Sequence, residues 1–186
     1  HIHRFAEDMD AAYDMAACIE ADIPRSLTAL ADHFEATPCP AFNVAPKIRE
    51  LLDGERAEGE VDPSFPMKPQ RVVNDIRKAL GDGDIALADT GAIKMWMARL
   101  YPTYEPLTCL ISNGLATMSF SLPGALGAKL ARPDRKVLAV MGDGSFLMNS
   151  QEIETALREK IPFVALVWVD GSYGLIKWKM DLELGG

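Results

Sequence analysis

The chain has 186 residues, of which 48% are hydrophobic. This is enough for one well-packed domain with an extension, but too little for two complete α/β domains. Nineteen basic against 27 acidic residues give a net charge of −8, which argues against nucleic acid or an anionic membrane as the main partner, because either needs a basic patch. No apolar run approaches the roughly 20 residues that span a membrane, and no signal-peptide pattern opens the chain. We therefore expect a cytoplasmic protein.

The three cysteines, Cys18, Cys39 and Cys109, are odd in number and far apart in the sequence. This spacing favours neither a disulfide framework nor a thiolate metal site. A reducing compartment is consistent with it.

Residues 1–38 are predicted to be the tail of a preceding α/β domain. Residues 16–22 are typical of a short buried strand, and a helix is expected after Ile23 with Leu27, Leu30, Ala31 and Phe34 on one face. The chain begins without Met and ends soon after a strand-like run, so we expect both ends to be cuts in a longer polypeptide.

Residues 39–66 are predicted to be a linker with one short helix near Ile48. The segment between Thr37 and Pro69 is rich in proline and surrounds a charged, glycine-containing stretch. The main domain is then expected to cover residues 67–186 and to be truncated at its C-terminal end.

The first half of this main domain alternates helical and strand patterns. Pro69 and Gly81 bracket a run with helical spacing, Ile85–Ala88 is a short apolar strand, and a second helix is expected to begin near Ile93.

The second half continues the alternation. A strand is predicted over Val137–Met141, and Asn149 with Glu152 resembles a capping box for a helix that runs to about Lys160. The next run, Phe163–Val169, is continuously apolar, which predicts a strand covered on both faces. The alternation indicates an α/β fold, a doubly wound parallel sheet.

Two of the predicted strands are followed by acids: Gly142-Asp143-Gly144 ends one and Asp170 ends the next. Ligands of open parallel sheets bind at the carboxyl ends of the strands, and a glycine-rich turn before a helix suits a diphosphate. A carboxylate beside a diphosphate is repulsive unless a cation lies between them, and two carboxylates with phosphate oxygens form the shell that Mg²⁺ or Ca²⁺ prefers. The sequence therefore predicts a metal-bridged diphosphate site.

Alternative interpretations of these motifs remain. Gly-Asp-Gly is also ordinary turn chemistry. A P-loop lacks its Gly-Lys-Ser/Thr, and a dinucleotide site lacks a third Gly after Ser145. The segment Asp82–Asp84 does not continue as an EF-hand, and no histidine lies in a nucleophile-base motif.

Taken together and in order, these motifs resemble thiamin-diphosphate-dependent enzymes of the acetolactate synthase large-subunit type. The resemblance covers most of residues 67–178 and extends into the preceding segment. It is carried by Gly142-Asp143-Gly144-Ser145, Asp170 with Tyr173-Gly174, Ile111–Met118, Leu122–Ala125, Phe146–Glu152 and Glu20–Pro24.

This resemblance implies that the carboxylates of Asp143 and Asp170 and the backbone carbonyl of Ser172 bind Mg²⁺. It also implies a set of residues that hold the diphosphate of thiamin diphosphate, with Gly144 and Ser145 donating backbone N–H groups; the set is Thr90, Gly91, Gly142, Gly144, Ser145, Tyr173 and Gly174.

Two further residues have roles implied by the resemblance. Met118 is expected to be the bulky residue over which the cofactor bends, and the carbonyl of Ala116 is expected to accept from its amino group. The alternative for Met118 is core filling, which methionine does well. No catalytic residue is expected in this chain, because the family's activating Glu lies on another domain, upstream of residue 1.

The chain departs from the family pattern at two places. Many relatives have Asn before or at the second metal ligand, whereas Val169-Asp170 is more similar to the catabolic acetolactate synthases. The region around Trp178 does not align with the substrate-contacting Trp of the anabolic enzymes, so the resemblance does not choose between branched-chain amino-acid biosynthesis and a catabolic role.

The activity implied is a transferase that decarboxylates a small 2-oxo acid such as pyruvate and gives 2-acetolactate. A homodimer or homotetramer is expected, and FAD in the parent protein can be neither assigned nor dismissed. Two alternatives stay open: a decarboxylase or carboligase of the same fold acting on glyoxylate, benzoylformate or oxalyl-CoA, and a cofactor-binding module without turnover.

Overall fold

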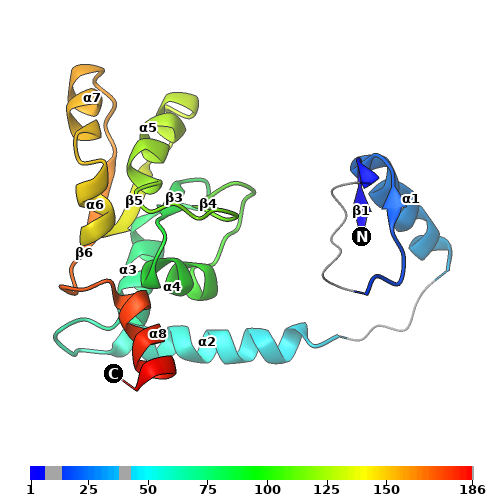
Figure 1. Ribbon diagram of the computed structural model, residues 1–186, viewed down its shortest axis with the longest axis horizontal. Helices are drawn as coiled ribbons and strands as arrows, with labels where there is room; N and C mark the ends of the chain where they lie inside the picture. Colours follow the sequence, from blue (N-terminus) through cyan, green and yellow to red (C-terminus); the bar gives the residue numbers. More distant parts are fainter. Residues whose placement is uncertain (7–13, 38–42, 186) are drawn as a thin grey trace. The chain divides into compact units, whose positions relative to one another are not determined.

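The computed structural model describes residues 1–6, 14–37 and 43–185, and the chain divides into two compact units, His1–Val44 and Ala45–Gly186 (Figure 1). The predicted boundary near residue 38 and Cys39 lie outside the described residues. None of the described helices is long and apolar enough to cross a membrane.

The first unit is a strand pair followed by a helix. Strand β1 (Ile2–His3) pairs in parallel with β2 (Ile19–Glu20), and α1 covers Ile23–Ala36. The helix begins after Asp22, whose carboxylate accepts from the backbone N–H of Arg25 at 3.1 Å.

The helix predicted after Ile23 is confirmed, but the buried strand predicted over residues 16–22 is wrong. Strand β2 has only two residues, and both are exposed. Its described partner is a strand of the same length, which covers neither face. The predicted apolar face of α1 is also exposed at Leu27, Leu30 and Phe34.

The second unit is built on a four-stranded sheet with the order β4-β3-β5-β6, and every described strand pair is parallel. The strands are β3 (Ile85–Ala88), β4 (Cys109–Ile111), β5 (Val137–Gly142) and β6 (Val164–Trp168). The expected doubly wound parallel α/β fold is confirmed.

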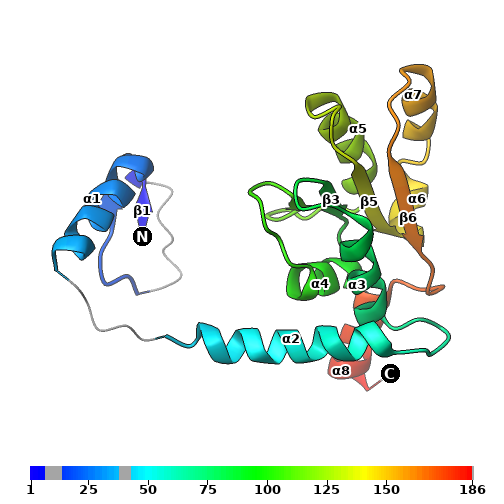
Figure 2. The same cartoon turned by 180° about the vertical axis from the view of Figure 1, so that it is seen from behind.

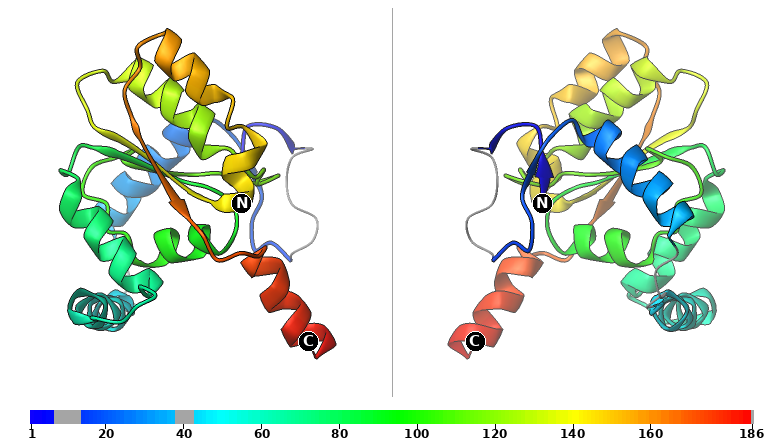
Figure 3. Two further views of the ribbon diagram at one scale, coloured as in Figure 1. Left: turned by 90° about the vertical axis from the view of Figure 1, so that its left-hand side faces the viewer. Right: turned by 90° about the vertical axis from the view of Figure 1, so that its right-hand side faces the viewer.

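Helices cover both faces of this sheet (Figures 1, 2 and 3). Ala86 and Ala88 of β3 face the core under α3 and α4, whereas Ile85 and Leu87 face the core under α5. This alternation follows from the two-residue period of a strand and requires apolar residues on both faces. The helices of one layer are α3 (Pro69–Ala79) and α4 (Ala92–Leu100), and those of the other are α5 (Ser121–Ala131), α6 (Asp143–Met148) and α7 (Glu152–Arg158).

The order of the strands creates a switch point between β3 and β5. The chain passes from β3 to its neighbour β4 on one side, and then returns to β5 on the other side of β3. The connections leaving β3 and β5 therefore diverge, and the crevice between them is where ligands of this fold class bind. Residues 89–91 and 143–145 begin the two diverging connections.

From Ala45 onward, the structure shows a helix in place of most of the linker predicted over residues 39–66, and this helix is longer than the short one expected near Ile48. Helix α2 covers Ala45–Val61 and packs on α3 and α4, so it belongs to the second compact unit. Gly59 makes this packing possible, because a Cβ at that position would lie 2.8 Å from the backbone carbon of Gln70. From the sequence alone, the glycine-containing stretch predicted an interruption of helical structure. In the structure, Gly59 instead allows close contact between α2 and α3.

Two predictions for the second half also need correction. The side chain of Asn149 does not cap α7; its Nδ2 donates to the carbonyl of Ser119 at 3.2 Å. Strand β6 is an edge strand of the described sheet. Leu166 and Trp168 pack against the core under α3 and α4, and Val167 packs against the core under α5. Val164, however, is 61% exposed. The predicted cover on both faces is therefore confirmed only for the second half of the strand.

Candidate functional site

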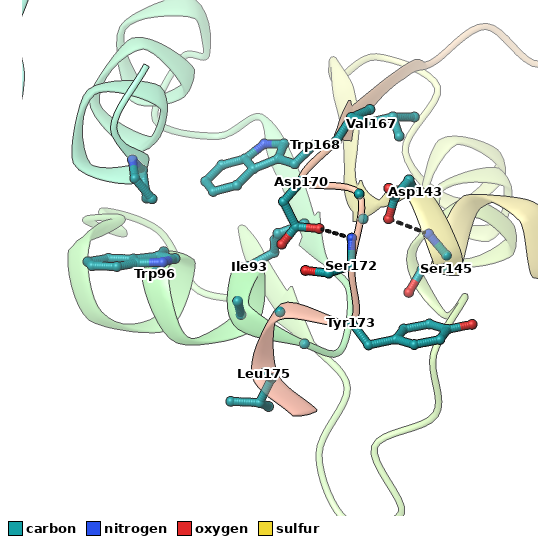
Figure 4. A pocket seen from close by; sticks show the side chains of 18 of the residues that line it. Ile93, Trp96, Asp143, Ser145, Val167, Trp168, Asp170, Ser172, Tyr173 and Leu175 are labelled. Atoms are coloured by element: carbon teal, nitrogen blue, oxygen red, sulfur yellow. Dashed lines mark hydrogen bonds between the residues drawn. The ribbon is translucent and has the colours of Figure 1, made fainter. Parts of the chain in front are cut away.

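A cavity of about 890 Å³ opens at the carboxyl ends of β3, β5 and β6 (Figure 4). Three connections form its polar side: residues 90–93 after β3, residues 142–145 after β5 and residues 169–176 after β6. The cavity therefore lies at the switch point.

Asp143 and Asp170 both lie in this cavity, and each accepts a hydrogen bond from a backbone N–H one or two residues further along the chain (Figure 4). Oδ1 of Asp143 accepts from the backbone N–H of Gly144 at 2.8 Å, and Oδ1 of Asp170 accepts from the N–H of Ser172 at 3.1 Å. Neither carboxylate forms an ion pair with a described residue. The second oxygen of each acid, Oδ2, has no hydrogen-bond partner among the described residues, which suits it to a cation.

Glycines allow close contact around these acids. A Cβ on residue 174 would lie 2.6 Å from Oδ2 of Asp170, and a Cβ on residue 144 would lie 2.8 Å from Cε1 of Tyr173. Only glycine fits at either position without a shift of a neighbour. Gly142 has an extended backbone, with φ −80° and ψ 164°, so the glycine-rich turn expected before the helix does not lie at this residue.

The β3 side of the cavity is formed by Thr90 and Gly91. Gly91 has φ +128°, a conformation that side chains rarely adopt, and it immediately precedes α4. The hydroxyl of Thr90 is buried and has no hydrogen-bond partner among the residues that the structure describes. A buried polar group without a partner costs free energy, so this hydroxyl is suited to a ligand oxygen.

The structure brings nearly all the predicted site residues to one place. The residues Thr90, Gly91, Met118, Gly142, Asp143, Gly144, Ser145, Asp170, Ser172, Tyr173 and Gly174 all line the cavity. Ala116 does not line it, and its backbone has φ +48°.

Asp89 is a residue of this region that sequence reasoning missed. Its side chain is fully buried, and its carboxylate accepts from the backbone N–H of Thr90 at 2.7 Å and from the hydroxyl of Ser121 at 2.9 Å. Asp89 could have been predicted as a site residue from the sequence, because it follows β3 as Asp143 and Asp170 follow their strands.

Trp96 and Trp168 were also missed, and they form part of an apolar side of the cavity (Figure 4). Nε1 of Trp168 is buried and finds no hydrogen-bond partner within the described part of the chain. Tryptophan in a helix or strand ordinarily packs in the core, so no sequence pattern indicated that either ring lies in a cavity.

The donor set fits a hard divalent cation that a ligand helps to coordinate. No cluster of three or more His, Cys, Asp or Glu side chains occurs among the described residues. Two carboxylates and a backbone carbonyl would leave coordination positions for phosphate oxygens and water. A cation here thus needs an anionic ligand to complete its shell.

Comparison with known proteins agrees with this geometry. Residues 89–186 match the family described as thiamine pyrophosphate enzyme, C-terminal TPP binding domain. The chain belongs to the thiamine pyrophosphate enzymes. Thiamine pyrophosphate, or thiamin diphosphate, is therefore the cofactor to which the cavity is assigned, and the match begins at Asp89, the first residue of the switch point.

Among thiamine pyrophosphate enzymes, the chain is similar to several acetolactate synthases. It is 36% identical to acetolactate synthase of Bacillus subtilis over 96% of this chain and 32% of the relative. It is 35% identical to the catabolic acetolactate synthase of Raoultella terrigena over 83% of this chain and 28% of the relative. The isozyme 1 large subunit of Escherichia coli is 38% identical over 63% of this chain and 21% of the relative. The chain thus spans a third or less of the length of these relatives.

Proposed function

We propose that this chain is the diphosphate- and metal-binding part of an acetolactate synthase that converts pyruvate to 2-acetolactate. The observation that carries the proposal is the meeting of Asp143 and Asp170 in one cavity at the switch point. The similarity to the Bacillus subtilis acetolactate synthase over 96% of this chain supports the choice of reaction.

Mg²⁺ is the proposed metal, bound by the carboxylates of Asp143 and Asp170 and the backbone carbonyl of Ser172. The diphosphate would receive hydrogen bonds from the hydroxyl of Thr90 and the backbone N–H of Ser145. The N–H of Gly144, which donates to Asp143 in the structure, is proposed as a further donor. The unpaired Thr90 hydroxyl supports this assignment.

When bound, thiamin diphosphate supplies the carbanion chemistry that decarboxylates a 2-oxo acid and transfers the remaining unit to a second carbonyl. The residues of this chain bind and orient it. Met118 lines the cavity and is proposed to bend the cofactor, and the carbonyl of Ala116 is proposed to accept from its amino group. We assign no catalytic acid to this chain, and expect an activating Glu in another part of the longer protein.

The proposal is tested by melting curves and product assays. Mg²⁺ with thiamin diphosphate should raise the melting temperature of the 186-residue chain, because a ligand that binds only the folded state stabilises it. The chain should not release carbon dioxide from pyruvate, whereas the longer protein should form acetolactate. Activity of the chain within about tenfold of the longer protein, equivalent to about 1.4 kcal/mol of barrier, would mean that it contains its own acid.

We also propose that the protein is cytoplasmic and forms a homodimer or homotetramer. Helix α5 presents exposed small and apolar residues, Gly127, Leu130 and Ala131, on the side away from the buried Leu122 and Ala125. Light scattering of the longer protein tests the oligomeric state, and a monomer at high concentration would contradict the proposed homodimer or homotetramer.

A further inference from the structure

The loop of residues 112–120, between β4 and α5, contains Met118 and adopts an unfavourable backbone conformation. Ala116 has φ +48° and Ser119 has φ +68°, although neither is glycine. Each such residue costs on the order of 1 kcal/mol. A loop with this conformation persists only if its surroundings hold it in place.

Lys94 holds the beginning of the loop. It lies in the first turn of α4, directly after the cavity-lining residues 90–93, and its Nζ donates to the carbonyl of Ser112 at 2.8 Å. Lys94 forms no ion pair with a carboxylate among the described residues. Among the described residues, the hydrogen bond of the Lys94 side chain is therefore the one with this loop.

Asp89 holds the end of the loop. Its buried carboxylate accepts from the backbone N–H of Phe120 at 3.4 Å and from the N–H of Ser121 at 3.2 Å. The same carboxylate accepts from the N–H of Thr90 at 2.7 Å. The carboxylate of Asp89 thus joins Thr90, which follows β3, to the residues after Met118.

Asn149 provides the third attachment. Its Nδ2 donates to the carbonyl of Ser119, the residue next to Met118, at 3.2 Å. Asn149 is the C-cap of α6, the helix that begins at Asp143. Both segments that flank the switch point are therefore bonded to the loop.

We propose that Asp89, Lys94 and Asn149 are positioning residues that hold Met118 in the cavity. They fix its place relative to residues 90–91 and 143–145, the two segments after β3 and β5 that are proposed to bind the diphosphate. This inference rests on the proposed function, since it concerns how that site receives the thiamin part of the cofactor. Loss of one attachment lets the strained loop relax and moves Met118. When the attachment through Lys94 or Asn149 is lost, the residues proposed to bind the diphosphate keep their positions, because neither side chain donates to them.

Calorimetric titration of the 186-residue chain in the presence of Mg²⁺ tests the proposal with two probes, thiamin diphosphate and inorganic diphosphate. Lys94→Met should weaken thiamin diphosphate about tenfold, equivalent to about 1.4 kcal/mol, and leave inorganic diphosphate within about twofold of the unaltered chain. Lys94→Arg should restore the binding of thiamin diphosphate, because its guanidinium can also donate to the carbonyl of Ser112.

A matched control is Lys129→Met. Nζ of Lys129 donates to the carbonyls of Pro133 and Arg135 at 3.0 and 2.6 Å, away from the cavity. This variant should lose a similar amount of stability and bind both probes as the unaltered chain does. Asn149→Ala is a second test of the loop, and it should repeat the pattern of Lys94→Met.

Three results would overturn the proposal. Equal weakening of both probes in Lys94→Met and Asn149→Ala would assign these residues to the diphosphate or to general stability. Unchanged binding of thiamin diphosphate in both would exclude a positioning role. Failure of the unaltered chain to bind thiamin diphosphate, while it binds inorganic diphosphate, would contradict the proposed function itself and the inference with it.

Discussion

Gly174 lies so close to Asp170 that a Cβ on residue 174 would come within 2.6 Å of Oδ2 of that carboxylate. The substitution Gly174→Ala must therefore displace the acid or the first turn of α8 (Gly174–Leu184). We expect it to weaken Mg²⁺-dependent binding of thiamin diphosphate by about tenfold or more, equivalent to about 1.4 kcal/mol. Calorimetric titration measures this.

The control for this prediction is Gly127→Ala in α5, where an added Cβ meets no atom within 4 Å. Alanine is the better helix former by about 1 kcal/mol, so the control should melt at a higher temperature and bind the cofactor unchanged. Unchanged affinity in Gly174→Ala as well would contradict the expectation that close contact at residue 174 holds the Asp170 carboxylate in its binding position.

Cofactor binding should depend on a divalent metal and on the charge of Asp143. The variant Asp143→Asn keeps an oxygen that can accept from the N–H of Gly144 but loses the negative charge that attracts Mg²⁺. We expect the folded state to be retained and metal-dependent binding to fall by at least about tenfold, or about 1.4 kcal/mol.

Titration of the unaltered chain in EDTA provides the matching condition, since it removes the metal and keeps both carboxylates. Binding should then be lost. Equal affinity with and without EDTA would contradict the metal assignment, and unfolding of Asp143→Asn would point to a structural role for the acid.

Helix α2 should contribute to the stability of the second unit through its contact at Gly59. A Cβ there would lie within 2.8 to 2.9 Å of Gln70 atoms, most of them backbone. Overpacking of this kind costs about 1–3 kcal/mol, so Gly59→Ala should lower the free energy of unfolding by that amount. Urea denaturation measures it.

Gly54→Ala, on the same helix, is the matched control because nothing lies within 4 Å of its added Cβ. It should raise stability by about 0.5–1 kcal/mol. If both variants became more stable, α2 would not pack closely on α3.

Cys109 should react slowly with iodoacetamide in the folded chain. Burial raises the pKa of its thiol from 9.0 to about 11, so its thiolate fraction at pH 8 falls about a hundredfold. Cys18 is exposed and should be alkylated first, as mass spectrometry of the labelled peptides would reveal. Urea should remove the difference, and equal rates without urea would mean that Cys109 is accessible.

The same shift sets a direction for stability at alkaline pH. The folded-state pKa of Cys109 lies above the value of an unperturbed thiol, so the unfolded chain loses its proton first as the pH rises. The contribution of this thiol to the free energy of unfolding is therefore fully present below about pH 9, and it is lost between about pH 9 and 11. Cys109→Ala should lessen this fall.

Much of the fold could be predicted because the period of the apolar residues is a local property. The helix at Pro69 and the strand at Ile85 have clear starts, stops and periods. The three-residue strand β4 was missed, since Cys109–Ile111 is too short to show a period. Helix α2 was predicted only as a short helix near Ile48, since glycine and charge over Asp53–Glu60 suggested a break.

Only some residues of the candidate site could be predicted from the sequence. Asp143 and Asp170 could be named because each follows a predicted strand, and ligands of open parallel sheets bind at the carboxyl ends of the strands. The roles of Lys94 and Asn149 could not, because each donates to a backbone carbonyl that is distant in the sequence, and a carbonyl has no residue type to signal it. The edge position of β6 likewise depends on the order of strands in the sheet, which a local pattern does not contain.

The parallel pairing of β3 with β5, Ala88 beside Val140, has a consequence for how the protein folds. The two strands are joined by a long segment that includes a whole excursion to β4, so their pairing must pay the entropy of closing a large loop before it gains any contact. The crevice does not exist until that step is complete. During refolding, the ability to retain thiamin diphosphate should thus appear only after most of the helical circular dichroism signal has returned.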